Sequence, residues 1–202
     1  MNKMHQWIVA TLLVCTAFGA QAQSPNSVIE EAAGLLATTL DGRKDELAAD
    51  REALYSVIDA ILLPRFDRTY AAQLVLGRTW RDASEEQRER FIAAFYNSLL
   101  RKYADGLLQY DQNRIEILPF RGDETKPRVI VKTLVQLDDG TEVPVDYGLV
   151  RRDSAWLVFD VIIEGISYVR NFRAELDAEV AATSLEAVIQ RLESENAAVP
   201  PG

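Results

Sequence analysis

The chain passes from strand to helix within one short stretch, Trp156-Leu-Val-Phe-Asp-Val-Ile-Ile-Glu-Gly-Ile-Ser-Tyr-Val-Arg-Asn-Phe-Arg173. Residues 156–163 are almost all β-branched, aromatic or Leu, which predicts a strand covered on both faces, with Asp160 as its only polar residue. Gly165 permits a turn, and Ser167 is placed to cap a helix. That helix is predicted from apolar residues at helical spacing, which are Val169, Phe172, Leu176 and Val180. The rest of the chain is expected to cover the apolar faces of this strand and helix.

Ser167 invites comparison with the nucleophile elbow, in which a catalytic serine sits on a strand-to-helix turn. That motif needs Gly two residues to either side, and Ser167 has Gly165 before it but Val169 after it. A serine nucleophile also needs a base such as His, and the only histidine of the chain is His5. We therefore interpret Ser167 as a helix N-cap.

Residues 1–22 have the pattern of a secretory signal peptide. Lys3 precedes an apolar core from Trp7 to Phe18, and Ala20-Gln-Ala22 provides a small-x-small cleavage site. The apolar core is too short to span a bilayer, and Cys15 lies within it, where it does not fit a lipoprotein signal. An exported protein cleaved after Ala22 is expected.

Removal of this leader changes which chemistry the chain can perform. It takes away Lys3, His5 and Cys15, which leaves 21 basic and 31 acidic residues and a formal charge of −10. An acidic chain lacks the basic footprint that nucleic acids require. Without His or Cys, the mature chain cannot build structural zinc sites, Ser-His triads or thiol chemistry. No cofactor or metal is expected.

Four helices are predicted before the sheet, each with a capping residue. Ser27-Val-Ile-Glu30 is read as a capping box, and the helix it opens ends at Asp41-Gly42. After a charged link, Asp50 caps a second helix, which Pro64 ends, and Asp67 begins a third that runs to Leu76. Ser84-Glu-Glu-Gln87 is another capping box, and its helix carries a wide aromatic stripe that includes Phe95, Tyr96, Tyr103 and Leu107.

The hydrophobic period changes to two from Asn113, which predicts strands. Ile115 and Ile117 alternate in the first, residues 129–137 form the second, residues 145–149 the third, and residues 156–163 the fourth. Asp138-Asp-Gly-Thr141 is a hairpin signal between the second and the third. The prediction is a four-stranded antiparallel meander.

After the helix from Ser167, Thr183-Ser-Leu-Glu186 is read as the cap of a final helix. The Pro-Pro-Gly end predicts a flexible tail over residues 194–202. We expect one α+β domain over residues 23–193, with several helices laid on one curved sheet.

Four phrases carry a resemblance to a known family. They are Val75-Leu-Gly-Arg-Thr-Trp-Arg-Asp-Ala-Ser84, residues 87–103, Val145-Asp-Tyr147, and residues 156–173 with their Asp-Val-x-x-Glu-Gly-x-Ser core. Together they resemble the MlaC family, also called the toluene-tolerance auxiliary proteins. The resemblance implies a sheet related to nuclear-transport-factor-2-like folds, with an apolar cavity between sheet and helices.

The resemblance also implies a function. Members of the family are periplasmic phospholipid carriers of Gram-negative bacteria, with phospholipid as cargo. They move it between an outer-membrane MlaA-like lipoprotein with a porin and an inner-membrane ABC transporter complex, MlaFEDB-like, which maintains the lipid asymmetry of the outer membrane. The chain is then not expected to be an enzyme.

Strand alternation predicts which side chains face the helices and line such a cavity. A one-residue register error would turn Lys132 and Asp146 to that face instead. The predicted lipid-binding residues are Tyr103, Leu107, Val131, Thr133, Val145, Tyr147, Leu149, Phe159, Val161 and Val169.

Two alternatives to a carrier remain at this point. An enzyme would rest on Asp160 and Glu164, whose backbones are about 13 Å apart along a strand, beyond the ~5–9.5 Å of paired glycosidase carboxylates. The plainer interpretation is that Asp160 accepts hydrogen bonds within the fold and Glu164 pairs with an Arg. The second alternative is a secreted adaptor that binds no lipid.

Overall fold

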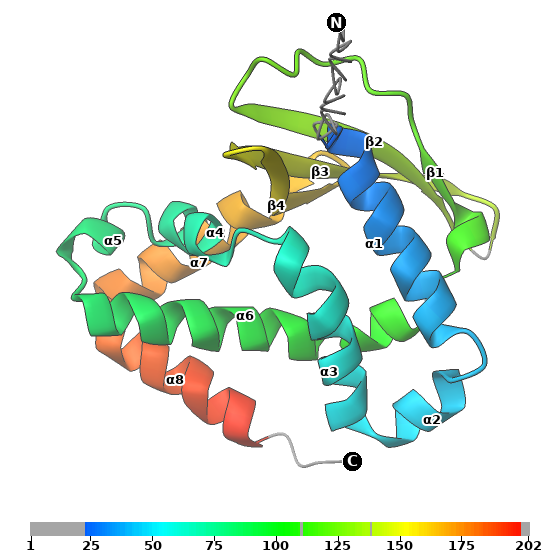
Figure 1. Cartoon of the computed structure of the whole chain (residues 1–202). Helices are drawn as coiled ribbons and strands as arrows, with labels where there is room; N and C mark the ends of the chain where they lie inside the picture. The colour runs from blue at the N-terminus through cyan, green and yellow to red at the C-terminus, as the bar shows by residue number, and fades with distance from the viewer. Residues whose placement is uncertain (1–22, 110, 138, 199–202) are drawn as a thin grey trace, which may run out of the picture.

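The computed structural model describes residues 23–109, 111–137 and 139–198 (Figure 1). The predicted leader, residues 1–22, lies outside this part of the chain. The described residues form an α+β fold in which helices cover one side of a curved antiparallel sheet, as the sequence predicted. No helix within residues 23–198, as far as they are described, is both long and apolar enough to cross a membrane.

Five strands form one sheet in the order β1-β2-β3-β4-β5, so each strand pairs with its neighbour in sequence. The first four are the predicted meander, and a two-residue fifth strand extends the predicted four-stranded sheet. It forms because Glu164 and Gly165, at φ 50° and 80°, reverse the chain tightly enough for the next two residues to pair back with β4. The strands are β1 (Ile115–Ile117), β2 (Arg128–Gln136), β3 (Glu142–Arg152), β4 (Ala155–Ile163) and β5 (Ile166–Ser167).

The register of the sheet is the one that alternation predicted. Tyr147 pairs with Val131 on β2 and with Val161 on β4, so these three share a face, and Lys132 and Asp146 point to the other. A β-bulge interrupts the pairing of β3 with β4, because Gly148 pairs with Asp160 whereas Leu149 pairs with Val158. One face of the sheet, which carries Tyr147, is turned to the helices, and the other, which carries Lys132 and Asp146, is turned to solvent.

Most predicted caps are confirmed. Asp50, Asp67 and Ser167 each accept a hydrogen bond from a backbone amide of the first helical turn, and Ser84 with Gln87 forms a complete capping box. The helices are α1 (Pro25–Leu40), α2 (Lys44–Ala49), α3 (Arg51–Leu62), α4 (Arg68–Leu76), α5 (Thr79–Asp82), α6 (Glu85–Leu108), α7 (Tyr168–Ala182) and α8 (Leu185–Ala198), with 3-10 turns at Leu63–Arg65 and Gln112–Arg114.

Several helix boundaries differ from the prediction. Ser24 rather than Ser27 caps α1, since Pro25 suits the first helical position. The cap of α8 is Ser184, whose hydroxyl accepts from the Ala187 amide, while Thr183 ends α7. The helix continues to Ala198, so residues 194–198 of the expected tail are helical. Helices α2 and α5 were not predicted.

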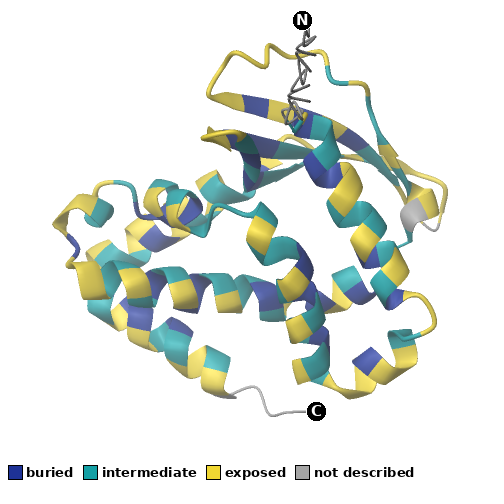
Figure 2. Cartoon of the chain, in the orientation of Figure 1, coloured by how far each residue is buried: buried dark blue, intermediate teal, exposed yellow. Residues whose placement is uncertain are grey.

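Three hydrophobic clusters hold the described fold together, and α6 takes part in two of them (Figures 1 and 2). Phe91 and Phe95, near its start, pack with α4, α7 and α8. Leu100 and Leu108, further along, pack with α1, α2 and α3. The third cluster joins the start of α1 to the sheet through Val28 and residues of β2, β3 and β4. Helices α1, α4 and α7 all contact the sheet.

Candidate functional site

A cavity of about 470 Å³ lies between the sheet, α1, α6 and α7. Its volume falls within the range of about 300–1,000 Å³ that is typical of small-molecule sites. Of the 27 described residues that line it, only Arg65 and Asp160 are charged. A cavity with this lining favours hydrocarbon over water.

Aromatic rings form the wall between α6 and α7. Tyr103 and Tyr168 meet edge to face with ring centroids 5.7 Å apart, and Phe172 contacts both Tyr168, at 6.1 Å, and Phe95, at 5.2 Å. Burial, together with a hydrogen bond to Tyr168, raises the pKa of Tyr103 to about 12. Two turns earlier on α6, the Tyr96 hydroxyl donates to Asp59 at 2.7 Å, and burial raises the pKa of Tyr96 as well. Both phenols stay neutral at physiological pH, so this wall adds no charge to the cavity.

Arg65 brings a positive charge to the cavity wall. Its Nη1 donates to the Ile61 carbonyl at 2.8 Å, and its Nη2 lies 3.5 Å from the Glu31 carboxylate. Its Nε is buried and has no hydrogen-bond partner among the described residues. A buried donor without a partner costs free energy, so the orientation of this guanidinium is set by its contacts to Ile61 and Glu31.

Asp160 joins the sheet to α7 rather than facing the cavity as a free carboxylate. Its Oδ2 accepts from the Ser167 hydroxyl at 2.6 Å, and its Oδ1 accepts from the Val169 amide at 3.0 Å. The Ser167 hydroxyl oxygen in turn accepts from the Arg170 amide at 3.1 Å, as the predicted N-cap requires. This network fixes the start of α7, which carries Val169, Tyr168 and Phe172 to the cavity.

We expect Asp160→Ala to lower the free energy of unfolding by about 3 kcal/mol, because two buried hydrogen bonds to a carboxylate are lost at once. For a chain of this size, that corresponds to a fall in Tm of about 6–12 °C by differential scanning calorimetry. Asp160→Asn, which keeps one acceptor oxygen, should lose less. Equal losses of stability from both variants would contradict the conclusion that the Asp160 carboxylate holds the start of α7 against the sheet.

The structure brings six of the ten predicted lining residues together around the cavity. They come from three elements: α6, the sheet and the start of α7. These residues are Tyr103, Leu107, Tyr147, Phe159, Val161 and Val169.

The other four predicted residues do not line the cavity. Val131 and Leu149 share a face with Tyr147 but lie fully buried in the cluster beneath α1. Thr133 is also fully buried, and its hydroxyl donates to the Val145 carbonyl at 2.5 Å. Val145 is half-buried beside it, outside the cavity lining. The face was predicted correctly, but α1 fills the space above Val131 and Leu149.

Several lining residues were not predicted. One face of α1 contributes Val28, Ile29, Ala32, Ala33 and Leu36. The apolar stripe of this helix was visible in the sequence, as was the Phe95-to-Leu107 stripe of α6, and both signalled burial. Nothing in the sequence distinguished the part of each stripe that meets a cavity from the part that meets a core.

The carboxylate pair considered for an enzyme is not assembled. Asp160 is buried in the hydrogen bonds described above, and Glu164 lies exposed on the turn after β4. The expected pairing of Glu164 with an Arg is absent from the described residues, because its turn conformation points it to solvent. Within the same residues, no group of three or more acidic, His or Cys side chains is placed to hold a metal ion.

A family model described as "MlaC: MlaC protein" matches residues 30–194 of this chain. The chain belongs to the MlaC family. The toluene tolerance protein ttg2D of Pseudomonas putida is 30% identical over 153 residues, which cover 75% of this chain and 71% of that protein. The MlaC intermembrane phospholipid transport system binding protein of Haemophilus influenzae is 24% identical over 178 residues, covering 84% of this chain and 83% of that protein.

The fold of the MlaC family is also found in a solved structure. A phospholipid-binding protein from Ralstonia solanacearum, determined in complex with a phospholipid, superposes with a TM-score of 0.77 and 23% identity. The match covers 87% of this chain and 98% of that one. The MlaC membership and the fold predicted from the sequence are thereby confirmed.

Proposed function

We propose that this protein is a periplasmic phospholipid carrier that holds the acyl chains of its cargo in the cavity between the sheet, α1, α6 and α7. The observation that carries the proposal is the lining of that cavity, in which Arg65 and Asp160 are the only charged residues among those the structure describes. The names of its relatives, an intermembrane phospholipid transport binding protein and a toluene tolerance protein, support it.

The energetics of lipid transfer favour an enclosed site. At about 0.8 kcal/mol per methylene, a phospholipid with about thirty methylenes has roughly 24 kcal/mol at stake when its chains enter water. A shallow groove cannot offset this, whereas a cavity that removes the chains from water can. The headgroup can then stay in water, and Arg65 is placed to meet an oxygen of the ester or phosphate region.

We further propose that the carrier shuttles lipid between an outer-membrane lipoprotein complex and an inner-membrane ABC transporter, and so maintains outer-membrane lipid asymmetry. Cleavage of residues 1–22 would deliver it to the space between the two membranes. It would carry its cargo unchanged, because the chain after the leader has neither His nor Cys and the Asp160 carboxylate is engaged in structural hydrogen bonds.

The test is the lipid content of the purified protein. Protein produced with its leader and purified without detergent should release phospholipid near one molecule per chain on solvent extraction, measured by phosphate assay and mass spectrometry. Native mass spectrometry should show the same mass on the intact protein. A clean lipid-free mass would favour the secreted adaptor instead.

A further inference from the structure

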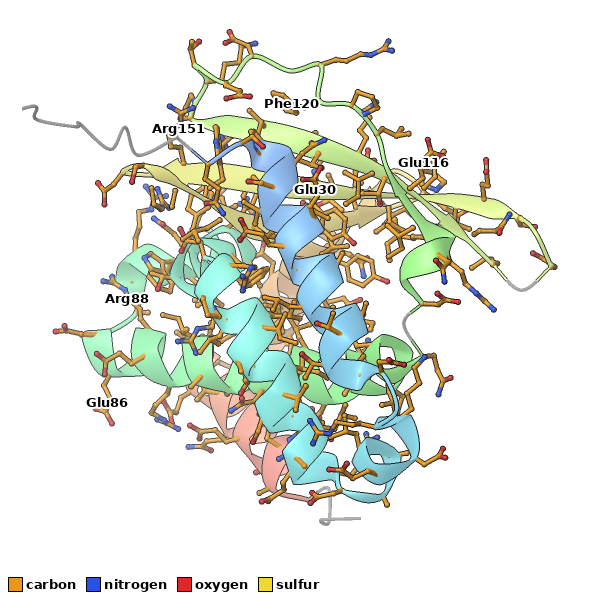
Figure 3. The ribbon with its side chains drawn as sticks, turned by 45° about the vertical axis from the view of Figure 1, so that its right-hand side comes forward. Glu30, Glu86, Arg88, Glu116, Phe120 and Arg151 are labelled. Atoms are coloured by element: carbon orange, nitrogen blue, oxygen red, sulfur yellow. The ribbon has the colours of Figure 1, made fainter. Side chains whose placement is uncertain are left out.

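A second hollow, of about 1140 Å³, lies on the solvent-facing side of the sheet. Its floor contains Ile130, Gly148 and Ile162 of the three long strands. One wall is the loop of residues 118–127, on which Figure 3 shows Phe120, and the other is the start of α7. We call this hollow the outer groove.

The outer groove is basic although the whole chain carries a formal charge of −9. Among the described residues that line it, only Asp123 and Asp160 are acidic, and the carboxylate of Asp160 accepts hydrogen bonds from Ser167 and Val169. Six cationic residues line it: Arg121, Lys126, Arg128, Lys132, Arg170 and Arg173. Because the groove is positively charged on a chain whose net charge is negative, it attracts anions.

Most of these cations are not neutralised by the protein itself. Arg121, Lys132 and Arg170 are exposed and form no ion pair within 4 Å among the residues that the structure describes. Arg128 donates to the Tyr70 hydroxyl at 3.3 Å and has no carboxylate within 4 Å in the described part of the chain, and Arg173 lies 3.7 Å from Asp177. By contrast, Arg90 on α6 is engaged closely by two carboxylates, those of Glu186 and Glu193, at 2.8 and 2.7 Å. The outer groove therefore leaves charge for an external anion.

The floor of the groove adds an apolar element at regular spacing. On β2, Arg128, Ile130 and Lys132 point to the same side at intervals of about 6.6 Å, since strand residues rise about 3.3 Å each. Ile130 is 49% exposed, so a large apolar side chain is open to solvent between the two cations. The order along the strand is thus basic, apolar, basic.

The geometry points to the outer groove as a docking site for an extended, acidic segment of a partner protein. Such a segment repeats its same-side residues at the spacing of β2, so the pattern acidic-x-apolar-x-acidic would place two carboxylates on Arg128 and Lys132 and an apolar side chain on Ile130. A planar anionic membrane fits less well, because the cations lie inside a concave hollow. The inference does not depend on lipid binding in the cavity.

The test uses a fluorescein-labelled peptide with the core Glu-Ser-Leu-Ser-Glu and the full mature protein. Fluorescence anisotropy should show binding that weakens as salt is raised, and a peptide with Gln in place of both Glu should bind poorly. The double variant Lys132→Gln with Arg170→Gln should bind the peptide about tenfold more weakly. The matched control, Arg43→Gln with Arg81→Gln, removes the same charge outside the groove and should bind as the wild type does.

Two further measurements make the outcome decisive. Bound lipid should be unchanged in the Lys132 and Arg170 variant, which separates this inference from the proposed carrier function. Co-sedimentation with phosphatidylglycerol vesicles tests the alternative ligand. Equal peptide affinity in both double variants would overturn the proposal, as would binding to the vesicles without binding to the peptide.

Discussion

Tyr147→Glu is expected to empty the cavity of lipid while the protein stays folded, and Leu149→Glu is expected to unfold it. The two residues lie two positions apart on the same face of β3. Tyr147 is half-buried and lines the cavity, so a carboxylate there would face acyl chains when lipid is bound but water when it is not. Leu149 is fully buried against Val131 and Trp156, so a carboxylate at this position would have no access to water with or without lipid.

The expected losses of folding stability differ between the two variants. Removal of a buried Leu side chain costs about 2–5 kcal/mol, and burial of a carboxyl group without partners adds to it. A total of at least about 4 kcal/mol approaches the 5–15 kcal/mol stability of a typical domain. Tyr147→Glu should cost about 1–2 kcal/mol, as most substitutions at partly exposed positions do.

The comparison requires delipidated protein, because bound lipid itself stabilises the folded state by mass action. Circular dichroism melts of delipidated wild type, Tyr147→Glu and Leu149→Glu give the stabilities, and mass spectrometry of the untreated proteins gives their lipid content. Tyr147→Phe keeps the ring and should keep the lipid. If Tyr147→Glu loses its cooperative transition along with its lipid, then Tyr147 is core and β3 does not line the cavity.

The Tyr147 and Leu149 pair also shows what the sequence predicted and what it did not. Alternation assigned both to the helix-facing side of β3, and the pairing with Val131 and Val161 agrees. The period of a strand, however, specifies only a face. Whether a side chain on that face meets a helix or an open space depends on where α1 crosses the sheet, and α1 lies about a hundred residues earlier in the chain.

The distinction between local and long-range interactions also explains which helices were predicted from the sequence and which were missed. Caps such as Asp50, Asp67 and Ser84 were predicted because the capping oxygen and the amide it accepts from are three residues apart. Helix α2 was missed because it has no side-chain cap and buries only Leu47, so its sequence shows no amphipathic period. Its six residues are held by packing against α3 and α6, which the local sequence does not encode.

Arg65 illustrates the limit for the site itself. In the sequence it follows Pro64 as one more charged residue at the end of a helix, where a cation is favourable for the helix dipole. Only the fold shows that its guanidinium borders the cavity, with Nε buried and without a hydrogen-bond partner in the described part of the chain. A residue of this kind is invisible to periodicity, because its role depends on the meeting of elements from the whole chain.

Gly106→Trp is expected to block lipid binding without destabilising the protein. Gly106 lies in α6, lines the cavity and is itself exposed, so it marks the rim of the opening. A Cβ added there has no heavy atom within 4 Å, which leaves room for a ring to cover the opening. Because Gly is the poorest helix former after Pro, its replacement should stabilise the helix by about 0.3–0.5 kcal/mol.

A ring at the rim competes with the acyl chains for space. Exclusion of two methylenes from the cavity would cost about 1.6 kcal/mol of binding free energy, or more than tenfold in affinity, and a Trp side chain is larger than that. Lipid loading of Gly106→Trp, measured by phosphate per protein, should fall accordingly, while the Tm of the delipidated variant should equal or exceed that of delipidated wild type.

Gly34→Trp is the matched control for this experiment. Gly34 lies in α1 with equally open space around a Cβ, but it is not part of the cavity lining. The substitution makes the same change in helix propensity and surface hydrophobicity, so it should raise the Tm similarly and leave lipid loading intact. Equal lipid loading in the two variants would mean that acyl chains enter past another element, and the opening would then have to lie away from α6.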